Sequence, residues 1–555
     1  MRSIFKKSSQ FILILAVSIG WIFSGWPQVF NFPPGIQKAL ATPVADFNIQ
    51  RRCETPAGGI GTVTLTAGTD YTAPADDTKA FIRMVSTRLS GMGDTSGGGT
   101  QEADDFTWYL SDPDFAGGSV VFTRTGTTNP QRFCWEIIEY VGSSGGANEI
   151  AVLDVGTAAY TTTGLMVDGA SVTVTDDNDV VVFITGQDSV EVTTQTLSAG
   201  LNTSEWVSAS DIPRFTRGLH DSDANHISYA VVEFTGSNWA VERIQHNFTL
   251  AGTTETETIT DVGSLTRAFA HAQYRSGTNN LDEYGAEMWL SATNQASFLL
   301  QSGATTPSDK YGVIWVVRNS DTVSGTAMNV QHLSGSRASA GVSEGAANEE
   351  DEWTVTITTV GDTAQTSIMG ESDRSSGTGN ATPRGWISFY LNSTTGVKLY
   401  QSDDGQTITY RFQVVEWPQS EPPPVYSVSI TSSGVIEYGF VELSTASSTV
   451  GNGYTQTAEN DGNTTEQLNV KSSDASGGTT WTLASAIGSN IFKHEFSTTT
   501  GSVWTVMPDS ATYVTAKPSV VVSGTVDFDF RLTTPSVSAD YQQKSITITV
   551  QAVAP

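Results

Sequence analysis

Residues 133–140 read Phe-Cys-Trp-Glu-Ile-Ile-Glu-Tyr, and close variants of this segment return at residues 227–234, 312–319 and 410–417. A charged side chain recurs at the same place in each copy, at Glu139, Glu233, Arg318 and Glu416. The spacing is about 90 residues, and similarity at a fixed period indicates a chain of similar modules. Other matches recur only after two modules, so the repeating unit is either one module or a pair.

The centre of each copy is a pair of β-branched residues, such as Ile137-Ile138. Successive side chains of a strand point to opposite faces, so the pair places apolar groups on both faces of a sheet. One face fills the core of a β-sandwich. The other is covered by a loop or by a neighbouring module, or it stays exposed as an apolar stripe. If neighbouring modules cover it, we expect them to stack as a semi-rigid rod.

Composition and turn spacing predict an all-β chain of tandem antiparallel β-sandwich modules, of jelly-roll or immunoglobulin-like type. Only 15% of the residues are charged, 52 are glycine, and no segment combines a helical period with caps. The predicted domains are 1–41 as a signal peptide or N-terminal anchor, 45–142, 143–236, 237–319 and 320–418 as sandwich modules 1 to 4, 419–424 as a proline-rich linker, and 425–555 as a C-terminal β-sandwich domain.

The charge balance limits the partners. The chain has 58 acidic and 28 basic residues and a net charge of −30. Phosphate binding needs clustered Lys and Arg, so this balance argues against nucleic acid and against an anionic membrane surface. It favours a soluble protein outside the cell, and a calcium-loaded surface is the sharper alternative.

The N-terminus has the features of an export signal. A basic start precedes an apolar run from residue 11 to residue 23, and Ala39-Leu40-Ala41 forms a cleavage site. The run is shorter than the ~20 residues of a membrane-spanning helix. An uncleaved N-terminal anchor is the alternative, and it is the only membrane contact that we predict. The protein is therefore expected to be secreted or held at the cell surface.

The two cysteines, Cys53 and Cys134, both lie in module 1. An even pair in an exported chain is most simply one disulfide. Two buried free thiols are the alternative.

Three parts of the chain resemble one family. Residues 18–27, the repeated Val-Val-Glu-aromatic strands, and segments 460–463, 481–483 and 545–550 are similar to exported β-sandwich repeat surface proteins of reduced-genome, host-attached bacteria. The resemblance covers both ends of the chain and the repeats. It implies a cell-surface location and β-sandwich modules, and it brings no catalytic residues.

Two patterns invite a catalytic interpretation. Residues 341–345 (Gly-Val-Ser-Glu-Gly) match the letters of a nucleophile elbow, but no strand precedes them and no helix follows, so we interpret them as a loop. The repeated acid is replaced by Arg318 in module 3, and a catalytic acid does not tolerate that charge reversal. We interpret it as a solvent-facing strand end paired with an Arg or Lys, and we predict no enzyme activity.

Two acidic clusters are candidate Ca²⁺ sites, because this cation prefers carboxylate oxygens. Their residues are Asp176, Asp177, Asp179, Asp221 and Asp223. The default interpretation of each cluster is a polar turn. No other cofactor is predicted.

Four tryptophans raise the question of sugar binding. Trp108, Trp206, Trp289 and Trp386 have apolar neighbours, which favours packing in a core. We therefore expect an exported, non-enzymatic cell-surface structural or adhesion protein, whose ligand is an unidentified glycan or protein. The alternative is a carbohydrate-binding surface lectin, with or without calcium.

Overall fold

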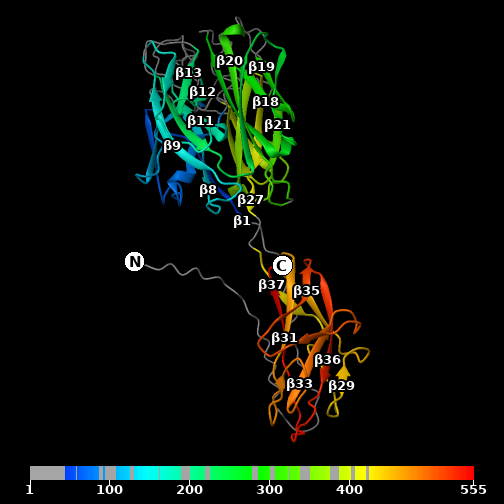
Figure 1. The fold of residues 1–555 in the computed structure, drawn as a ribbon. Helices are drawn as coiled ribbons and strands as arrows, with labels where there is room; N and C mark the ends of the chain where they lie inside the picture. Colours follow the sequence, from blue (N-terminus) through cyan, green and yellow to red (C-terminus); the bar gives the residue numbers. More distant parts are fainter. Residues whose placement is uncertain are drawn as a thin grey trace. The chain divides into compact units, whose positions relative to one another are not determined.

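The computed structural model describes residues 44–555, except 58, 87–91, 94–107, 125–130, 162, 189–200, 219–224, 278–284, 301–306, 324, 338–350, 376–386, 402–406 and 421–423. The predicted export signal lies outside the described residues. The chain divides into two compact units, one from Pro43 to Glu421 and one that includes Pro422 to Pro555 (Figure 1). Every regular element in the described residues is a strand or a short 3-10 turn. The predicted all-β class is therefore confirmed.

Module 1 shows the plan of all four modules. Its strands are β2 (Phe47–Glu54), β3 (Thr62–Thr66), β4 (Ala80–Met84), β6 (Tyr109–Asp112), β7 (Ser119–Thr123) and β8 (Gln131–Tyr140), with the short β5 (Met92–Gly93) paired to β8. The first, sixth and third strands form one antiparallel sheet, β2-β8-β4, and the second, fifth and fourth form the other, β3-β7-β6. The 3-10 turn η1 (Asp77–Lys79) precedes the third strand.

The same two groups of three strands return in modules 2, 3 and 4, and one group of module 3 joins one group of module 4 in a six-stranded sheet. Module 2 has β9 (Ala151–Ala159), β10 (Met166–Asp168), η3 (Asp177–Asp179), β11 (Val180–Gln187), β12 (Asn202–Val207), β13 (Ile212–Arg217) and β14 (His226–Glu233). Module 3 has β15 (Trp239–Asn247), β16 (Thr254–Thr258), η5 (Leu265–Arg267), β17 (Ala268–Ser276), β18 (Ala286–Ala292), β19 (Gln295–Leu300), η7 (Pro307–Asp309) and β20 (Lys310–Asn319). Module 4 has β21 (Asn329–Arg337), β22 (Asp351–Thr356), η8 (Thr363–Gln365), β23 (Thr366–Ser375), β24 (Ile387–Ser393), β25 (Gly396–Gln401) and β26 (Ile408–Glu416). The smallest repeating unit of the fold is thus one six-stranded module.

The four modules close into a ring, because each docks its fourth strand on the next module. In every case a backbone N–H of the fourth strand donates across the contact: Leu110 to Ser228 Oγ at 3.1 Å, Ser204 to Gln273 Oε1 at 2.7 Å, Met288 to Ser372 Oγ at 3.1 Å, and Phe389 to the Val85 carbonyl at 3.1 Å. The last of these brings module 4 back to module 1.

The two ends of this unit also pair with each other. β1 (Val44–Ala45) lies antiparallel to β27 (Gln419–Ser420), as Figure 1 shows. The expected rod is therefore wrong, since a rod would hold modules 1 and 4 apart. The docking is head-to-tail, and a head-to-tail contact that closes gives a ring rather than a filament.

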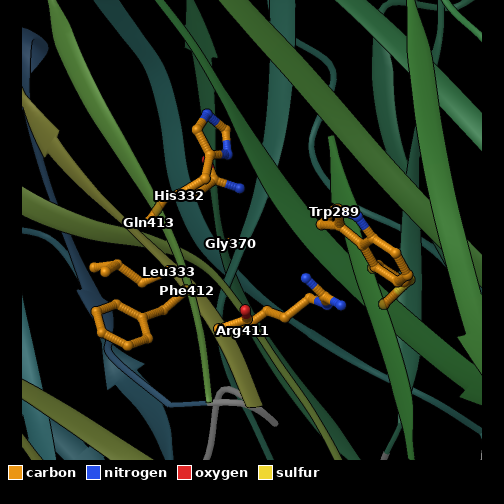
Figure 2. Close-up of a pocket in the computed structure, with 9 residues that line it drawn as sticks. Trp289, His332, Leu333, Gly370, Arg411, Phe412 and Gln413 are labelled. Atoms are coloured by element: carbon orange, nitrogen blue, oxygen red, sulfur yellow. The ribbon is translucent and has the colours of Figure 1, made fainter. Parts of the chain in front are cut away.

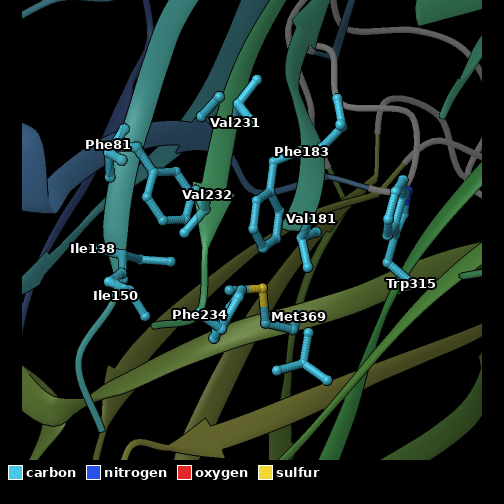
Figure 3. Close-up of a cluster of buried hydrophobic side chains, with 14 of the residues drawn as sticks. Phe81, Ile138, Ile150, Val181, Phe183, Val231, Val232, Phe234, Trp315 and Met369 are labelled. Atoms are coloured by element: carbon cyan, nitrogen blue, oxygen red, sulfur yellow. The ribbon is translucent and has the colours of Figure 1, made fainter. Parts of the chain in front are cut away.

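The apolar pair of the repeated strand explains why the modules share a core. In modules 1, 3 and 4 one residue of the pair enters a core shared by all four modules, while the other enters a separate core. The residues in the shared core are Ile138, Val317 and Val415, and their partners are Ile137, Val316 and Val414. Figure 3 shows part of the shared core, with Ile138, Val232, Trp315 and Met369 from the four modules. Both faces of the strand are buried, as predicted, and neighbouring modules supply the cover.

Aromatic rings bring three modules together within the shared core. Trp417 of module 4 stacks on Phe47 of module 1 with ring centres 4.4 Å apart. It also contacts Phe269 and Trp239 of module 3, at 5.4 and 6.2 Å. Such pairs add about 0.5–1.5 kcal/mol each beyond the burial of their area.

The C-terminal unit is a separate β-sandwich. Its strands are β28 (Val428–Ile430), β29 (Ala446–Ser448), β30 (Gln456–Asn460), β31 (Glu466–Ser472), β32 (Thr482–Leu483), β33 (Ile491–Ser497), β34 (Thr505–Met507), β35 (Val514–Val520), β36 (Thr525–Thr533) and β37 (Ile548–Val553). One sheet follows the order β28-β30-β36-β33-β32 and the other β35-β31-β37. Val526, Phe528, Phe530 and Leu532 of β36 are all buried in its core.

Candidate functional site

The charged position of the repeated strand holds the turn before the third strand. Glu139 and Glu233 are only 4% and 2% exposed. Glu139 accepts the N–H of Ala75 at 2.6 Å, and Glu233 accepts those of Thr175 and Asp176 at 2.8 and 2.7 Å. The interpretation of these acids as solvent-facing strand ends is therefore wrong. They are buried because the backbone donors of the turn satisfy them.

The exchange of acid for base in module 3 follows from the same turn. Glu416 of module 4 accepts the N–H of Gly361 at 2.5 Å, as the other acids do. Arg318 instead donates from Nη1 to the carbonyl of Asp261 at 2.8 Å. A carboxylate accepts from backbone N–H groups and a guanidinium donates to carbonyls, so either charge holds the turn.

The acids first considered as metal ligands have structural roles in this turn. Asp176 caps η3, where it accepts the N–H of Asn178 at 2.9 Å. Asp177 accepts the indole N–H of Trp206 at 2.7 Å. Burial raises the pKa of Asp179, and the charges of Asp176 and Glu233 raise it further.

The other modules repeat this capping position. Asp76, Ser264 and Asp362 cap η1, η5 and η8, and each accepts the N–H two residues on. Capping by Ser or Asp is thus a property of the fold. Asp221 and Asp223 lie outside the described residues, as does the 341–345 motif. Within the described ranges, no group of three or more His, Cys, Asp or Glu is placed to hold a metal ion.

The predicted disulfide is confirmed. Cys53 of β2 and Cys134 of β8 face each other across the antiparallel pair, with their Cα atoms 4.0 Å apart. Cys134 also packs into the core of module 4 beside Val85. The disulfide therefore lies at the contact between modules 1 and 4.

We call the contact between two neighbouring modules a seam, and that between modules 4 and 1 the closing seam. In each module, the third and sixth strands are paired, and we compare the residue pair at one equivalent position. We call this position the level of the pair. These pairs are Arg83 with Glu136, Phe183 with Ala230, His271 with Trp315, and Met369 with Gln413. Only module 1 has an oppositely charged pair at this level.

The Arg83 pair is part of a buried ion cluster across the closing seam. The guanidinium of Arg83 lies 2.7 Å from Glu371 Oε1 and 3.8 Å from Glu136 Oε2. Arg51 Nε lies 3.2 Å from Glu136 Oε1. Both arginines also donate to backbone carbonyls of module 4, Arg51 to Thr366 and Arg83 to Ile368.

A bulge in β23 brings Glu371 into this cluster. The pairing of β23 with β26 shifts between Met369 and Ser372, and Gly370 within the bulge has φ of +63°. A Cβ on Gly370 would lie 2.4 Å from Gln413 Nε2 and 2.7 Å from the Ala270 carbonyl. Only glycine fits this conformation and this space.

Burial controls the protonation of the groups at this level. It raises the pKa of Glu371 to about 7, while Arg83 opposes the shift. It lowers the pKa of His271 to about 3, and the charge of Arg83 acts in the same direction. His271 is therefore neutral at physiological pH. Arg83, Glu136 and Glu371 are at most 5% exposed, so the cluster can join two modules but cannot reach a substrate.

A small cavity lies between modules 3 and 4 (Figure 2). Its volume is about 50 Å³, and its lining residues are Met288, Trp289, His332, Leu333, Ser334, Gly370, Arg411, Phe412 and Gln413. This volume holds a few water molecules and is well below the ~300–1,000 Å³ of ligand pockets.

Two of the polar side chains that line this cavity have partners in the protein, although Nδ1 of His332 has none among the described residues. The Arg411 guanidinium lies 3.7 Å from the centre of the Trp289 ring, and its Nε donates to Glu287 at 2.6 Å. His332 Nε2 donates to the Leu265 carbonyl at 2.9 Å, and burial lowers the pKa of His332. The cavity is thus a packed junction with space for water.

Most described tryptophans outside the aromatic group of the shared core have a cation over the ring. The pairs are Trp108 with Arg124, Trp289 with Arg411, Trp315 with Arg243, Trp353 with Arg337, Trp481 with Lys544, and Trp504 with Arg531. Trp206 packs against the shared core, and Trp386 lies outside the described residues. A ring face occupied by a cation does not offer its surface to a sugar.

The ion cluster was not predicted from the sequence, although one signal for it was present. Arg83 lies among apolar residues of β4, and Glu136 stands between Trp135 and the apolar pair of β8. Their partner Glu371 is 288 residues from Arg83, so no local pattern connects them.

Comparison with protein-family models and with curated proteins finds no match to this sequence. Within the part of the chain that the structure describes, no helix is long and apolar enough to cross a membrane.

Proposed function

We propose that this protein is an exported structural or adhesion protein of the cell surface, without enzyme activity. A closed ring of four β-sandwich modules forms its body, and the C-terminal β-sandwich is a second unit. The Cys53–Cys134 disulfide and the strongly acidic composition support a place outside the cell, where disulfides persist and a net negative charge keeps proteins soluble.

The observation that carries this proposal is the use of the buried charges. Arg51, Arg83, Glu136 and Glu371 bind one another and the backbone across the closing seam. The repeated acids hold turns, and Arg411 and His332 of the cavity bind neighbouring groups of the protein. The polar chemistry of the described ring thus maintains its shape, which is what a supporting or presenting surface protein needs.

Location is the first test. The chain is produced in a bacterial host with residues 1–41 and, separately, without them, and intact cells are labelled with a membrane-impermeant biotin reagent. We expect labelled or secreted protein with the disulfide formed only when residues 1–41 are present. A chain that stays inside the cell with both thiols free would contradict the proposal. So would turnover in a panel of peptides, esters and glycosides.

The lectin alternative has its own test on the cavity tryptophan. The purified chain is applied to a glycan panel with calcium and with chelator, together with Trp289→Ala and the matched variant Trp504→Ala. Both tryptophans carry an arginine over the ring, but only Trp289 borders the cavity. Glycan binding that is lost in W289A and kept in W504A would replace the structural proposal by the lectin. The structural proposal predicts no glycan binding that depends on Trp289.

A further inference from the structure

The turn from Asn460 to Glu466 in the C-terminal unit contains two acids whose bonding is incomplete. It follows β30 and lies against residues 425–427, where the chain enters this unit. The Asp461 N–H donates to the Ser427 carbonyl at 3.0 Å, and the Asn463 N–H donates to the Val425 carbonyl at 3.2 Å. In return, Asn463 Oδ1 accepts the N–H of Val425 at 2.7 Å.

The sequence of the turn fits this close contact. Asn460 is fully buried, and its side chain donates to the carbonyls of Thr464 and Val520 at 2.8 and 2.9 Å. A Cβ on Gly462 would lie 2.1 Å from the Val425 carbonyl oxygen, so only glycine lets the two segments meet. The turn is therefore fixed in place before any ligand binds.

Glu466 is the unusual group. Its exposed fraction is 0%, and one carboxylate oxygen, Oε2, accepts the N–H of Ser427 at 2.9 Å. The other oxygen, Oε1, is buried and has no hydrogen-bond partner among the described residues. Asp461 Oδ1 is likewise buried without a partner. An unpartnered buried carboxylate oxygen is costly, which calls for a ligand at this position.

The charge of Asp461 acts on the carboxyl group of Glu466. Burial raises the pKa of Glu466 to about 7, the Ser427 N–H opposes this shift, and the charge of Asp461 adds to it. No Lys or Arg of the described chain pairs with either acid at ion-pair distance. A buried acid and a partly exposed acid that repel each other are stabilised by a multivalent cation.

We propose that Asp461 and Glu466 bind one Ca²⁺ ion at this turn. Ca²⁺ takes several hard oxygen ligands in a flexible arrangement, including carboxylates, carbonyls and water. Glu466 Oε1 and Asp461 Oδ1 supply the two charged ligands, and water and oxygens of the turn complete the shell. The ion fastens the Asn460–Glu466 turn at the point where the chain enters the C-terminal unit. The site is independent of the proposed surface function.

The test uses the full chain, freed of metal by a chelator and titrated calorimetrically with CaCl₂ at pH 7.5. Three variants are compared with the parent: Asp461→Asn, Glu466→Gln and the control Glu459→Gln, which changes an acid on β30 close to the turn. We expect D461N and E466Q each to weaken this Ca²⁺ site at least tenfold and E459Q to leave it unchanged. Ca²⁺ should raise the melting temperature of the C-terminal unit in the parent and E459Q only.

Two further measurements keep the proposal falsifiable. Near-UV circular dichroism shows whether each variant folds, and the partly exposed D461N decides the question if E466Q does not. Lowering the pH to 5.5 should weaken binding at least tenfold, because protons compete for Glu466. Equal Ca²⁺ binding by the parent and folded D461N would overturn the proposal. A second pair of results would also overturn it: a parent melting temperature that does not change with Ca²⁺, and a melting temperature of E466Q that equals or exceeds that of the parent. In that case the two acids share a proton and do not need a cation.

Discussion

The closing seam and the seam between modules 2 and 3 have the same backbone contact but different side chains. In each, the fourth strand of one module donates an N–H to the next module. The closing seam adds the charged cluster around Arg83. At the same level of module 3 stands His271, which burial keeps neutral, beside Trp315, whose Nε1 donates to Ser204 Oγ at 3.2 Å.

Chain connectivity explains this difference. Modules 2 and 3 are joined by the short segment between Glu233 and Trp239, so they are neighbours whatever their side chains are. Arg83 and Glu371 are 288 residues apart, so modules 1 and 4 are not held together by a short connection, and their contacts, this ion pair among them, must make them partners. Buried ion pairs contribute more to the choice of partner than to net stability, because desolvation offsets most of their attraction. We infer that the cluster specifies closure of the ring.

The largest effect is expected from breaking this cluster. Arg83→Met leaves Glu371 and Glu136 buried beside an apolar side chain, and such a break costs about 3–5 kcal/mol. We expect urea unfolding of the ring to shift by this amount. Amide hydrogen exchange at residues 366–369 should also become faster. The Ile368 carbonyl loses its donor Arg83, and the Thr366 carbonyl is bound by Arg51, whose orientation depends on the same cluster.

The control for R83M is the equivalent position of module 4. Met369→Leu conserves volume and should cost less than about 1.5 kcal/mol. The double variant R83M/E371L should recover part of the lost stability, since it removes one orphaned charge. Equal losses for R83M and M369L would show that the charge has no special role at the closing seam.

The disulfide acts on the same seam through covalent structure. Replacing both cysteines, C53A/C134A, should lower the free energy of unfolding of the ring by about 2–4 kcal/mol. The bond closes a loop between residues that are 81 positions apart, which restricts the unfolded chain. Cys134 also packs in the core of module 4, so its replacement removes packing at the closing seam. Calorimetry with and without reductant checks this, and an unchanged melting temperature would contradict it.

Asn148 joins three modules at a single side chain. It is 4% exposed, donates to Asp46 Oδ2 at 2.9 Å, and accepts from Asn238 and Asn319 at 2.9 and 3.1 Å. Asn148→Ala leaves these partners without their hydrogen bonds. We expect the free energy of unfolding, measured in urea, to fall by about 2–3 kcal/mol. Asn329→Ala, which removes one exposed hydrogen bond to Glu416, should cost well under half as much.

The smallest change in stability at neutral pH is expected from replacing a buried histidine, and the chain offers two for comparison. His271 and His494 both have a pKa lowered to about 3 by burial, so both are neutral when folded. His494 binds Tyr438 and Ser472 through its two nitrogens, whereas both nitrogens of His271 lack a partner in the described structure. We therefore expect H271L to change stability by less than about 1 kcal/mol and H494L to lose more, because it orphans two hydroxyls.

The same pair gives a pH dependence. Below its unfolded pKa of 6.5, each histidine binds a proton only when unfolded, so acid favours unfolding. The contribution of each histidine to the free energy of unfolding is complete above pH 6.5. It falls by about 1.4 kcal/mol per pH unit as the pH is lowered toward 3. H271L should reduce this acid sensitivity of the ring, where the buried His332 remains, and leave that of the C-terminal unit unchanged. Parallel melting curves at pH 7 and pH 4 measure the difference.

Much of the fold was predictable from the repeated strand. The spacing of Glu139, Glu233, Arg318 and Glu416 indicated similar modules, and the apolar pair beside each indicated a strand with two apolar faces, one of them in a core. The disulfide followed from the cysteine count. The modules and the apolar pair are visible in short stretches of sequence, so the alternation of apolar and polar residues along each strand is enough to predict them.

The ring, its ion cluster and the turn that we propose to bind Ca²⁺ were not predictable in the same way. They depend on which residues meet across hundreds of positions, as Arg83 and Glu371 do, or on which oxygens remain without a donor after folding, as in Glu466. The burial of Glu139 was also missed, because its partners are backbone N–H groups of a turn, and sequence letters do not show backbone donors.

The most direct test of the closed ring is a cross-link between its two ends. Ala45 of β1 and Gln419 of β27 face each other in the antiparallel pair. The variant A45C/Q419C, oxidised in dilute solution, should form an intramolecular disulfide in nearly every molecule, with Cys53–Cys134 intact by peptide mapping. Failure to cross-link, or cross-links only between molecules, would show that modules 1 and 4 do not meet and would contradict the ring.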